Sequence, residues 1–260
     1  MTIHTGYDEG MLCWADLSTT DLPAAKKFYG HLFGWTMADA PTGDPDTVYV
    51  MCKQRGHDAA ALQAMPDALK AQGIPPHWLA YVSVKDVDAR AKKVEAHGGQ
   101  LLMSPMDVMD AGKMALVADP TGATFALWQG NKHAGAGVMG EPGSLCWMEL
   151  MTKDPKAATA FYSAVLPWTA KVSPEYTEWQ VGKQAAGGMM EMKGAHFEGV
   201  PSHWTVNFTV EDCDAAVKKA HGLGASVLLP PTDVAEVGRF AVLHDPQGAA
   251  FNLIKLAPHG

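Results

Sequence analysis

The stretch LCWADLSTTDLPAAKKFYGHLFGW, residues 12–35, returns later in the chain as LCWMELMTKDPKAATAFYSAVLPW, residues 145–168, at an offset of 133. A second pair of stretches, residues 76–99 and 202–225, repeats with an offset of 126. Self-similarity over such lengths indicates that a whole domain is duplicated. The change in offset indicates a longer loop in the first copy, which we place at the Pro- and Gly-containing stretch Pro41–Asp46.

Each copy is predicted to contain two units in which a strand is followed by a helix and further strands. The first unit opens with a strand over Met11–Leu17, and Asp21 is a suitable N-cap for the helix that follows. Apolar residues then recur at helical spacing and form one buried stripe. Further strands are predicted near Val48–Lys53, Ala59–Met65, His77–Val84, Leu101–Met103, Lys113–Ala118 and Thr124–Gln129, with a second helix between Asp86 and Gly98.

This pattern predicts an α+β fold in which four βαβββ modules form two tandem domains. We expect the first domain over residues 8–130, a Gly-rich linker over residues 131–143 and the second domain over residues 144–257. The chain has 260 residues, of which 47% are hydrophobic, and this is enough apolar material for two cores.

The bulk composition excludes some partners. The net charge is −8 and no run of Lys or Arg stands out, so nucleic acid and anionic membrane surfaces are poor partners. The four cysteines form no CxxC motif, the N-terminal stretch is polar, and no apolar run is long enough to span a membrane. We therefore expect a cytoplasmic protein, as a monomer or a homodimer.

Alternation along the strands assigns side chains to two faces. In the opening strand, one face carries Met11, Cys13, Ala15 and Leu17, which we expect against the helix, and the other carries Leu12, Trp14 and Asp16. In the second copy the division is Cys146, Met148 and Leu150 against Leu145, Trp147 and Glu149. In the strands that open the second units, Trp78 and Trp204 are predicted to lie in the core. The opposite face of those strands carries His77, Leu79 and Tyr81, and in the second copy His203, Thr205 and Asn207.

Three motifs recur in the same order in both copies. They are an Asp followed by Phe-Tyr and Trp (Asp21, Phe28, Tyr29, Trp35), a Val-x-Asp (Val84, Asp86), which in the first copy precedes the glycine pair Gly98–Gly99, and a DPxG followed by an aromatic residue (Asp119, Pro120, Gly122, Phe125). This order resembles the vicinal oxygen chelate superfamily, which includes glyoxalases, bleomycin-resistance proteins and dioxygenases. The resemblance implies paired modules whose curled mixed sheets surround clefts that hold a small molecule.

The resemblance also implies where a metal would be bound. It places the ligands of the metal-using members at Trp14 and Trp147, at Leu79 and Thr205, and at Ala126 and Asn252, with Gln63 or Glu191 as the remaining ligand. Trp, Leu and Ala offer no donor to a divalent ion, and Thr and Asn are weak ligands alone. We therefore expect no metal at this position and no cofactor, and a divalent metal only at a non-standard site.

Other groups on the same faces are the candidates for chemistry. Asp16 with His77, and Glu149 with His203, are catalytic candidates, because an acid and an imidazole that meet across antiparallel strands transfer protons. The alternative is that each histidine binds a backbone carbonyl at the start of its strand. The candidates for binding a ligand are Trp14, Leu79, Tyr81, Trp128, Trp147, Thr205, Asn207 and Asn252, and the tryptophans offer rings for stacking.

Three classes of function remain open at this point. The first, which we favour, is a small-molecule binding protein without the usual metal ligands, whose ligand is an aromatic or cationic metabolite or antibiotic. The second is an enzyme, either a glyoxalase-like lyase or a hydroxylase- or dioxygenase-like oxidoreductase, that uses the two acid–histidine pairs. The third is a scaffold whose clefts are empty.

Overall fold

The computed structural model describes residues 2–44 and 47–258. The first half of the chain contains β1 (Leu12–Thr19), α1 (Leu22–Phe33), β2 (Thr36–Ala40), β3 (Tyr49–Gln54), β4 (His57–Ala64), α2 (Asp67–Ala71), β5 (His77–Ser83), α3 (Val87–Ala96), β6 (Gln100–Val108), β7 (Gly112–Ala118) and β8 (Thr124–Gly130). The second half contains β9 (Leu145–Thr152), α4 (Pro155–Val165), β10 (Thr169–Val172), β11 (Thr177–Val181), β12 (Gln184–Glu191), the 3-10 helix η1 (Ala195–Phe197), β13 (His203–Thr209), α5 (Cys213–Gly222), β14 (Ser226–Val234), β15 (Gly238–His244) and β16 (Ala250–Leu256).

Each half forms one eight-stranded mixed sheet, with the orders β2-β3-β4-β1-β5-β8-β7-β6 and β10-β11-β12-β9-β13-β16-β15-β14. The first strands of the two modules, β1 with β5 and β9 with β13, pair antiparallel in the middle of each sheet. Within a module the first strand pairs parallel with the last one. The prediction of an α+β fold with four βαβββ modules in two tandem domains is confirmed. The boundaries at residues 8, 131 and 144 remain a prediction.

The helices begin where the sequence predicted. The Asp21 carboxylate accepts a hydrogen bond from the Ala24 amide at 3.0 Å, and Asp86, Asp154 and Asp212 cap their helices in the same way. Helix α1 ends at Gly34, whose φ of 74° suits glycine. The short strands β2 and β10 and the helix α2 were missed, because they are short and expose most of their side chains, so no apolar period marks them.

The extra residues of the first copy lie in two places. Strand β2 corresponds to β10 at an offset of 133, whereas β3 corresponds to β11 at an offset of 127, which pairs Tyr49 with Tyr176. Most of the extra residues therefore lie between β2 and β3, as predicted for Pro41–Asp46. Residues 45 and 46 of that stretch lie outside the described residues. The offset falls to 126 only between β4 and β5.

A β-bulge changes the predicted faces at the start of β1 and β9. The register of β1 against β5 passes from Leu12 opposite Val82 to Trp14 opposite Tyr81 and skips Cys13. Because of this extra residue, Leu12 joins the core with Ala15 and Leu17, while Cys13 lies on the face of Trp14. The same bulge in β9 puts Leu145 in the core with Met148 and Leu150, and skips Cys146. The assignment of Cys13 and Cys146 to the helix face was therefore wrong, whereas the assignment of Trp78 and Trp204 to the core was right.

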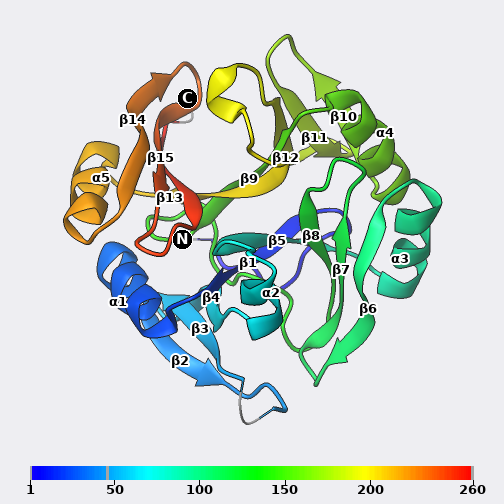
Figure 1. The fold of residues 1–260 in the computed structure, drawn as a ribbon, viewed down its shortest axis with the longest axis horizontal. Coiled ribbons are helices and arrows are strands. Elements are labelled where there is room, and N and C mark those ends of the chain that lie inside the picture. Colours follow the sequence, from blue (N-terminus) through cyan, green and yellow to red (C-terminus); the bar gives the residue numbers. More distant parts are fainter. Residues whose placement is uncertain (1, 45–46, 259–260) are drawn as a thin grey trace.

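The two domains share one core between their sheets, and α1 lies beside α5 and α3 beside α4 at its flanks (Figure 1). Trp78 donates a hydrogen bond through Nε1 to the Tyr29 hydroxyl at 3.1 Å, and Tyr29 donates to Asp245 of the other domain at 3.0 Å. Tyr29 and Asp245 both belong to the repeated motifs, so residues of these motifs join one domain to the other. None of the helices in the described part of the chain has the length and apolarity that a membrane crossing requires.

Candidate functional site

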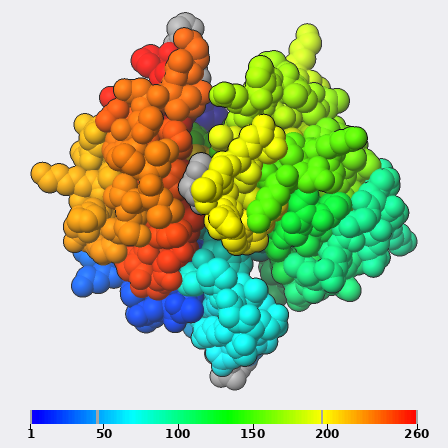
Figure 2. Space-filling view, turned by 45° about the horizontal axis from the view of Figure 1, so that its top comes forward, coloured from blue at the N-terminus to red at the C-terminus, as the bar shows by residue number. Residues whose placement is uncertain are grey.

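The face of each sheet that points away from the shared core carries most of the predicted site residues. We call the surface of the first sheet around Trp14, Asp16, Tyr49, Tyr81 and Trp128 cup 1. Cup 2 is the equivalent surface of the second sheet around Trp147, Glu149, Tyr176, Asn207 and Asn252. On the face of the molecule drawn in Figure 2, the orange residues of β14 lie near the yellow segment that contains η1.

Cup 1 contains a chain of hydrogen bonds that ends on a buried carboxyl group. Trp14 donates through Nε1 to the Tyr49 hydroxyl at 3.0 Å, and Tyr49 donates to Asp16 Oδ2 at 3.1 Å. Tyr81 donates to the same oxygen at 2.6 Å, and the Gln63 amide donates to Oδ1 at 3.4 Å. Asp16 is 1% exposed, and its burial raises the pKa of the carboxyl group. The hydrogen bonds from the two tyrosines and the charge of His77 lower this pKa, but their effect is smaller than that of burial.

The segment that connects the domains covers cup 1. The His133 ring meets the Trp14 ring edge-to-face with 4.5 Å between the centroids, and Trp128 donates through Nε1 to the His133 carbonyl at 2.9 Å. Ala136 is fully buried in the cup and donates its amide to the Cys13 carbonyl at 2.8 Å. The Trp14 side chain is consequently 2% exposed, and no face of its ring is available to a solute.

Cup 2 repeats the same chain of hydrogen bonds, and no part of residues 2–44 and 47–258 covers its tryptophan with a ring as His133 does in cup 1. Trp147 donates through Nε1 to the Tyr176 hydroxyl at 2.8 Å, and this hydroxyl also interacts with the Glu149 carboxyl. All three residues are half-buried. Among the described residues, no other aromatic ring packs against the ring of Trp147. Burial raises the pKa of Glu149, and burial together with the charge of Glu149 raises the pKa of Tyr176.

An amide pair lies beside Trp147 in cup 2. Asn252 donates through Nδ2 to Asn207 Oδ1 at 3.1 Å, and Asn207 donates through Nδ2 to the Trp147 carbonyl at 3.4 Å. The Asn252 Oδ1 atom is buried without a hydrogen-bond partner within the described part of the chain. An unpaired buried acceptor costs free energy and is suited to a donor from a ligand. Cup 1 has Tyr81 and Ala126 at the equivalent positions, so this amide pair belongs to cup 2 only.

The two candidate histidines lie at the start of β5 and β13. His77 stands opposite Ser18 in the sheet, while Asp16 stands opposite Leu79, and His77 Nδ1 lies 2.9 Å from the Pro75 carbonyl. His203 likewise bonds the Pro201 carbonyl at 2.9 Å, and burial lowers its pKa. Glu149 stands opposite Thr205. Among the described residues no hydrogen bond joins either acid to its histidine, so both dyads remain predictions.

The donor set at the family's metal position does not fit a divalent ion. Trp14, Leu79 and Ala126 face cup 1 together and provide no nitrogen or oxygen ligand for a metal. Gln63 does face cup 1, where it is bonded to Asp16, whereas Glu191 is exposed and pairs with Lys193 at 2.8 Å. In residues 2–44 and 47–258 no group of three or more His, Cys, Asp or Glu side chains is arranged to hold a metal ion.

Three features of the cups were missed in the sequence. Tyr49 and Tyr176 link tryptophan to acid in both cups, and their repeat at an offset of 127 is a signal that could have found them. His133 was treated as part of a linker, and its place against Trp14 leaves no trace in the sequence. Gly188 lies beneath Tyr176 and Trp147, and a Cβ atom there would overlap the Tyr176 hydroxyl.

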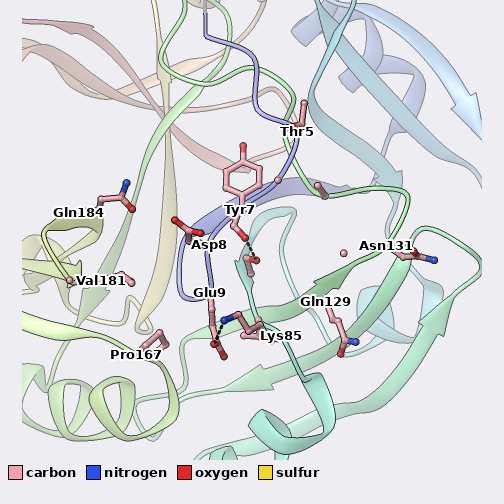
Figure 3. Close-up of a pocket in the computed structure, with 16 residues that line it drawn as sticks. Thr5, Tyr7, Asp8, Glu9, Lys85, Gln129, Asn131, Pro167, Val181 and Gln184 are labelled. Atoms are coloured by element: carbon pink, nitrogen blue, oxygen red, sulfur yellow. Dashed lines mark hydrogen bonds and ion pairs between the residues drawn. The ribbon is translucent and has the colours of Figure 1, made fainter.

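A large cavity lies outside both cups, at the boundary between the domains. It has a volume of about 800 Å³ and opens between the N-terminal segment, the ends of β5 and β8, and the β11–β12 turn. Figure 3 shows Tyr7 and Asp8 on one side of it and Gln184 and Val181 on the other. A smaller cavity of about 230 Å³ shares Tyr7, Asp8 and Gln184 with it and reaches Trp147 at the end of cup 2.

Comparison with known proteins extends over both sheets. Residues 12–127 match the sequence pattern described as "Glyoxalase/Bleomycin resistance protein/Dioxygenase superfamily", and residues 147–254 match that of a "Glyoxalase-like domain". The Mycobacterium tuberculosis protein CFP32, which bears a provisional glyoxylase name, is 45% identical over 99% of both chains. The "Anthracycline biosynthesis protein DnrV" of Streptomyces peucetius is 36% identical over 97% of this chain and 95% of its own.

Solved structures show the same arrangement of both domains. The 2,3-dioxygenase LapB from Pseudomonas sp. KL28 aligns with a TM-score of 0.64 at 15% identity, over 97% of this chain and 94% of its own. A variant of 4-hydroxymandelate synthase from Streptomyces coelicolor aligns with a TM-score of 0.64 at 14% identity, over 98% and 95% of the two chains. At this level of identity the likeness concerns the fold.

Proposed function

Because the chain belongs to the glyoxalase/bleomycin resistance/dioxygenase superfamily, whose clefts hold small molecules, we propose that cup 2 binds a planar aromatic small molecule without a metal ion. One observation carries this proposal. In cup 1 the ring of His133 packs edge-to-face against the ring of Trp14, while the equivalent ring of Trp147 is half-buried and no aromatic ring packs against it in the described part of the chain. A planar ligand in cup 2 takes the place that His133 takes in cup 1.

The polar groups of cup 2 define what else the ligand carries. Asn252 Oδ1 accepts a hydroxyl or amino proton, and the Glu149 carboxyl offers a proton to a carbonyl or phenolate oxygen when it is protonated. Two relatives are named for the biosynthesis of anthracyclines, which are fused-ring aromatic compounds, and this supports a planar ring system with oxygen substituents.

The test is calorimetric titration with a panel of planar aromatic compounds that includes an anthracycline, in buffer containing a chelator. Trp147→Ala removes the stacking surface and is expected to weaken binding of the best compound roughly tenfold or more. Tyr49→Phe, which alters the hydrogen-bonded chain of the covered cup 1, serves as the control and is expected to leave that affinity unchanged. Equal binding by Trp147→Ala, or binding only after a divalent metal is added, would contradict the proposal.

A second function, proton transfer on the bound ligand, is favoured by the state of Glu149. This carboxyl group is half-buried at the ligand surface and its pKa is raised, which suits a general acid or base near neutral pH. The relative with a glyoxylase name supports the same chemistry. We expect Glu149→Gln to stop deuterium exchange next to the carbonyl of a bound aromatic ketone, as followed by NMR, and Asp16→Asn to preserve it. Exchange that survives Glu149→Gln would eliminate this second function.

A further inference from the structure

The smaller cavity lies in a gap between two strands that diverge. The pairing of the parallel strands β9 and β12 begins at Glu149 and Gly188, and the residues before these two positions separate. The cavity of about 230 Å³ is lined there by Cys146–Met148 of β9 and Gln184–Ala186 of β12. We call this space the β9–β12 gap. Tyr7, Asp8 and Gln184 line both this space and the large surface cavity, whose lining is drawn in Figure 3.

In the first domain the equivalent gap is filled by a peptide segment of this chain. Strands β1 and β4 pair only from Asp16 and Ala61 onward, and residues 135–138 of the connecting segment lie where they diverge. Ala136 donates its amide to the Cys13 carbonyl at 2.8 Å. Gly137 and Val138 donate theirs to the Asp58 carbonyl at 2.7 and 3.3 Å. The segment therefore acts as a short strand that satisfies the carbonyl groups on both sides of the gap.

Among the described residues, no segment bonds to the edges of the β9–β12 gap in this way, although His4, Gly6, Tyr7 and Asp8 also line the cavity. At the repeat offset of 133, residues 2–5 hold the positions of residues 135–138, but they take another course. The His4 amide donates to the Gly137 carbonyl at 3.0 Å, and Ile3 forms a bridge with Val138 and is 42% exposed. Among the described residues, no backbone amide from outside the sheet donates to the carbonyls of Cys146 and Ala185, which correspond to those of Cys13 and Asp58.

The N-terminal segment cannot copy the course of residues 135–138 for a steric reason. Gly135 has a φ of 135°, and a Cβ atom there would overlap the Cys13 carbonyl oxygen. Thr2 stands at the equivalent position, and a threonine in this conformation would be strained and would collide with the Cys146 carbonyl. A segment that follows the course of residues 135–138 into the β9–β12 gap therefore needs a glycine where Thr2 would stand.

We propose that the β9–β12 gap binds an extended segment of a partner protein that carries a glycine followed by a small residue, as in Gly135–Ala136. The partner's backbone amides donate to the carbonyls of Cys146 and Ala185, which is the mode known as β-strand addition. The small residue at the second position is required because its equivalent, Ala136, is fully buried. This peptide site adjoins cup 2 at Trp147 and is independent of the aromatic ligand proposed above.

The test uses a blocked hexapeptide with the sequence AAGAGV, which copies residues 133–138 with alanine in place of the aromatic His133, in an NMR titration of the whole protein. We expect saturable shifts at the backbone amides of Gln184, Ala185 and Ala186 and at the Trp147 indole. A peptide with an N-methyl group on its fourth residue cannot donate to Cys146 and is expected to bind roughly tenfold more weakly. A peptide with threonine as its third residue is expected not to bind, because the threonine Cβ atom would overlap the Cys146 carbonyl, as it would at Thr2.

A pair of variants locates the peptide. Ala185→Leu fills the gap with a side chain and is expected to weaken binding at least tenfold, whereas Lys183→Leu changes an exposed residue of the same turn that lines neither cavity. Lys183→Leu should bind as the wild type does. The proposal is overturned if no saturable shift occurs, if the N-methylated peptide binds equally well, or if Ala185→Leu has no effect. These results are separable from those for aromatic ligands, because the peptide carries no planar ring system and contacts backbone carbonyls.

Discussion

The two cups of this protein are built from the same repeat and differ in what lies over the tryptophan on their floor. In cup 1, Trp14, Tyr49 and Asp16 are joined by hydrogen bonds and covered by His133 and Ala136. In cup 2, the chain of Trp147, Tyr176 and Glu149 is half-buried and uncovered within the described residues. Duplication thus gives one domain whose cup is part of the structural core and one whose cup is available to a ligand.

The two cups are alike at one pair of equivalent positions. A tryptophan stands in both at the first position that the resemblance implies for a metal ligand, and the acid two residues further along is held by a tyrosine in both. In cup 1 the acid is sealed from solvent. In cup 2 the corresponding acid, Glu149, is half-buried, which suits the acid–base role that we propose for it.

The largest expected effect is on stability and separates the two tryptophans. Trp14→Ala removes a ring that is 2% exposed and leaves a cavity, so we expect the free energy of unfolding to fall by about 3–5 kcal/mol. Trp147→Ala should cost clearly less, because that ring is half-buried and packs against no other ring among the described residues. Urea denaturation of both variants measures the difference. Equal losses would show that cup 2 is as closed as cup 1.

The next effect concerns the segment that covers cup 1. Gly135→Ala adds a Cβ atom against the Cys13 carbonyl at a φ of 135°, and we expect a loss of about 3 kcal/mol. Gly140→Ala is the matched control, because its φ is 75° and the space around its Cβ position is open, so only the backbone term of about 1 kcal/mol applies. Denaturation midpoints of the two variants give the comparison. A tolerated Gly135→Ala would mean that the cover is loosely held.

A smaller effect tests whether the His133 ring is the only reason why cup 1 differs from cup 2 in ligand binding. His133→Ala removes the ring that packs on Trp14, which should cost about 1 kcal/mol in stability. The change exposes Trp14 and should add a second, weaker binding event for the aromatic compound that binds cup 2. Calorimetric stoichiometry measures this. An unchanged stoichiometry, with Trp14 still protected from a soluble quencher, would mean that Ala136 and Trp128 close cup 1 without the histidine.

The smallest effect is on the pH dependence of stability. Burial raises the pKa of Asp16, so the native state keeps this proton at pH values where the unfolded chain has lost it. The contribution of Asp16 to the free energy of unfolding is therefore greatest below about pH 4, where the unfolded carboxyl is also protonated, and falls as the pH rises through the native pKa. Asp16→Asn should reduce the decrease in stability with rising pH more than Glu149→Gln does, because Asp16 is fully buried and Glu149 is only half-buried. Denaturation midpoints across this range check the order.

The fold was predictable from the sequence because it depends on local patterns that occur twice. Asp21 and Asp86 cap helices, apolar periods mark the core faces, and the repeat supplies the two-domain arrangement. The bulge at Cys13 was not predictable, since period-two alternation hides a single inserted residue. The positions of Trp14 and Trp147 in the cups followed from the alternation of side chains along their strands. The cover over Trp14, in contrast, depends on a contact with His133, which is more than a hundred residues away in the sequence.

The most direct measurement is an NMR titration that follows the two indole N–H signals, of Trp14 and Trp147, while a planar aromatic compound is added in the presence of a chelator. We predict that the Trp147 signal shifts saturably and that the Trp14 signal stays in place. A shift of Trp14 with Trp147 unaffected, or no shift of either signal until a divalent metal is supplied, would contradict the assignment of ligand binding to cup 2.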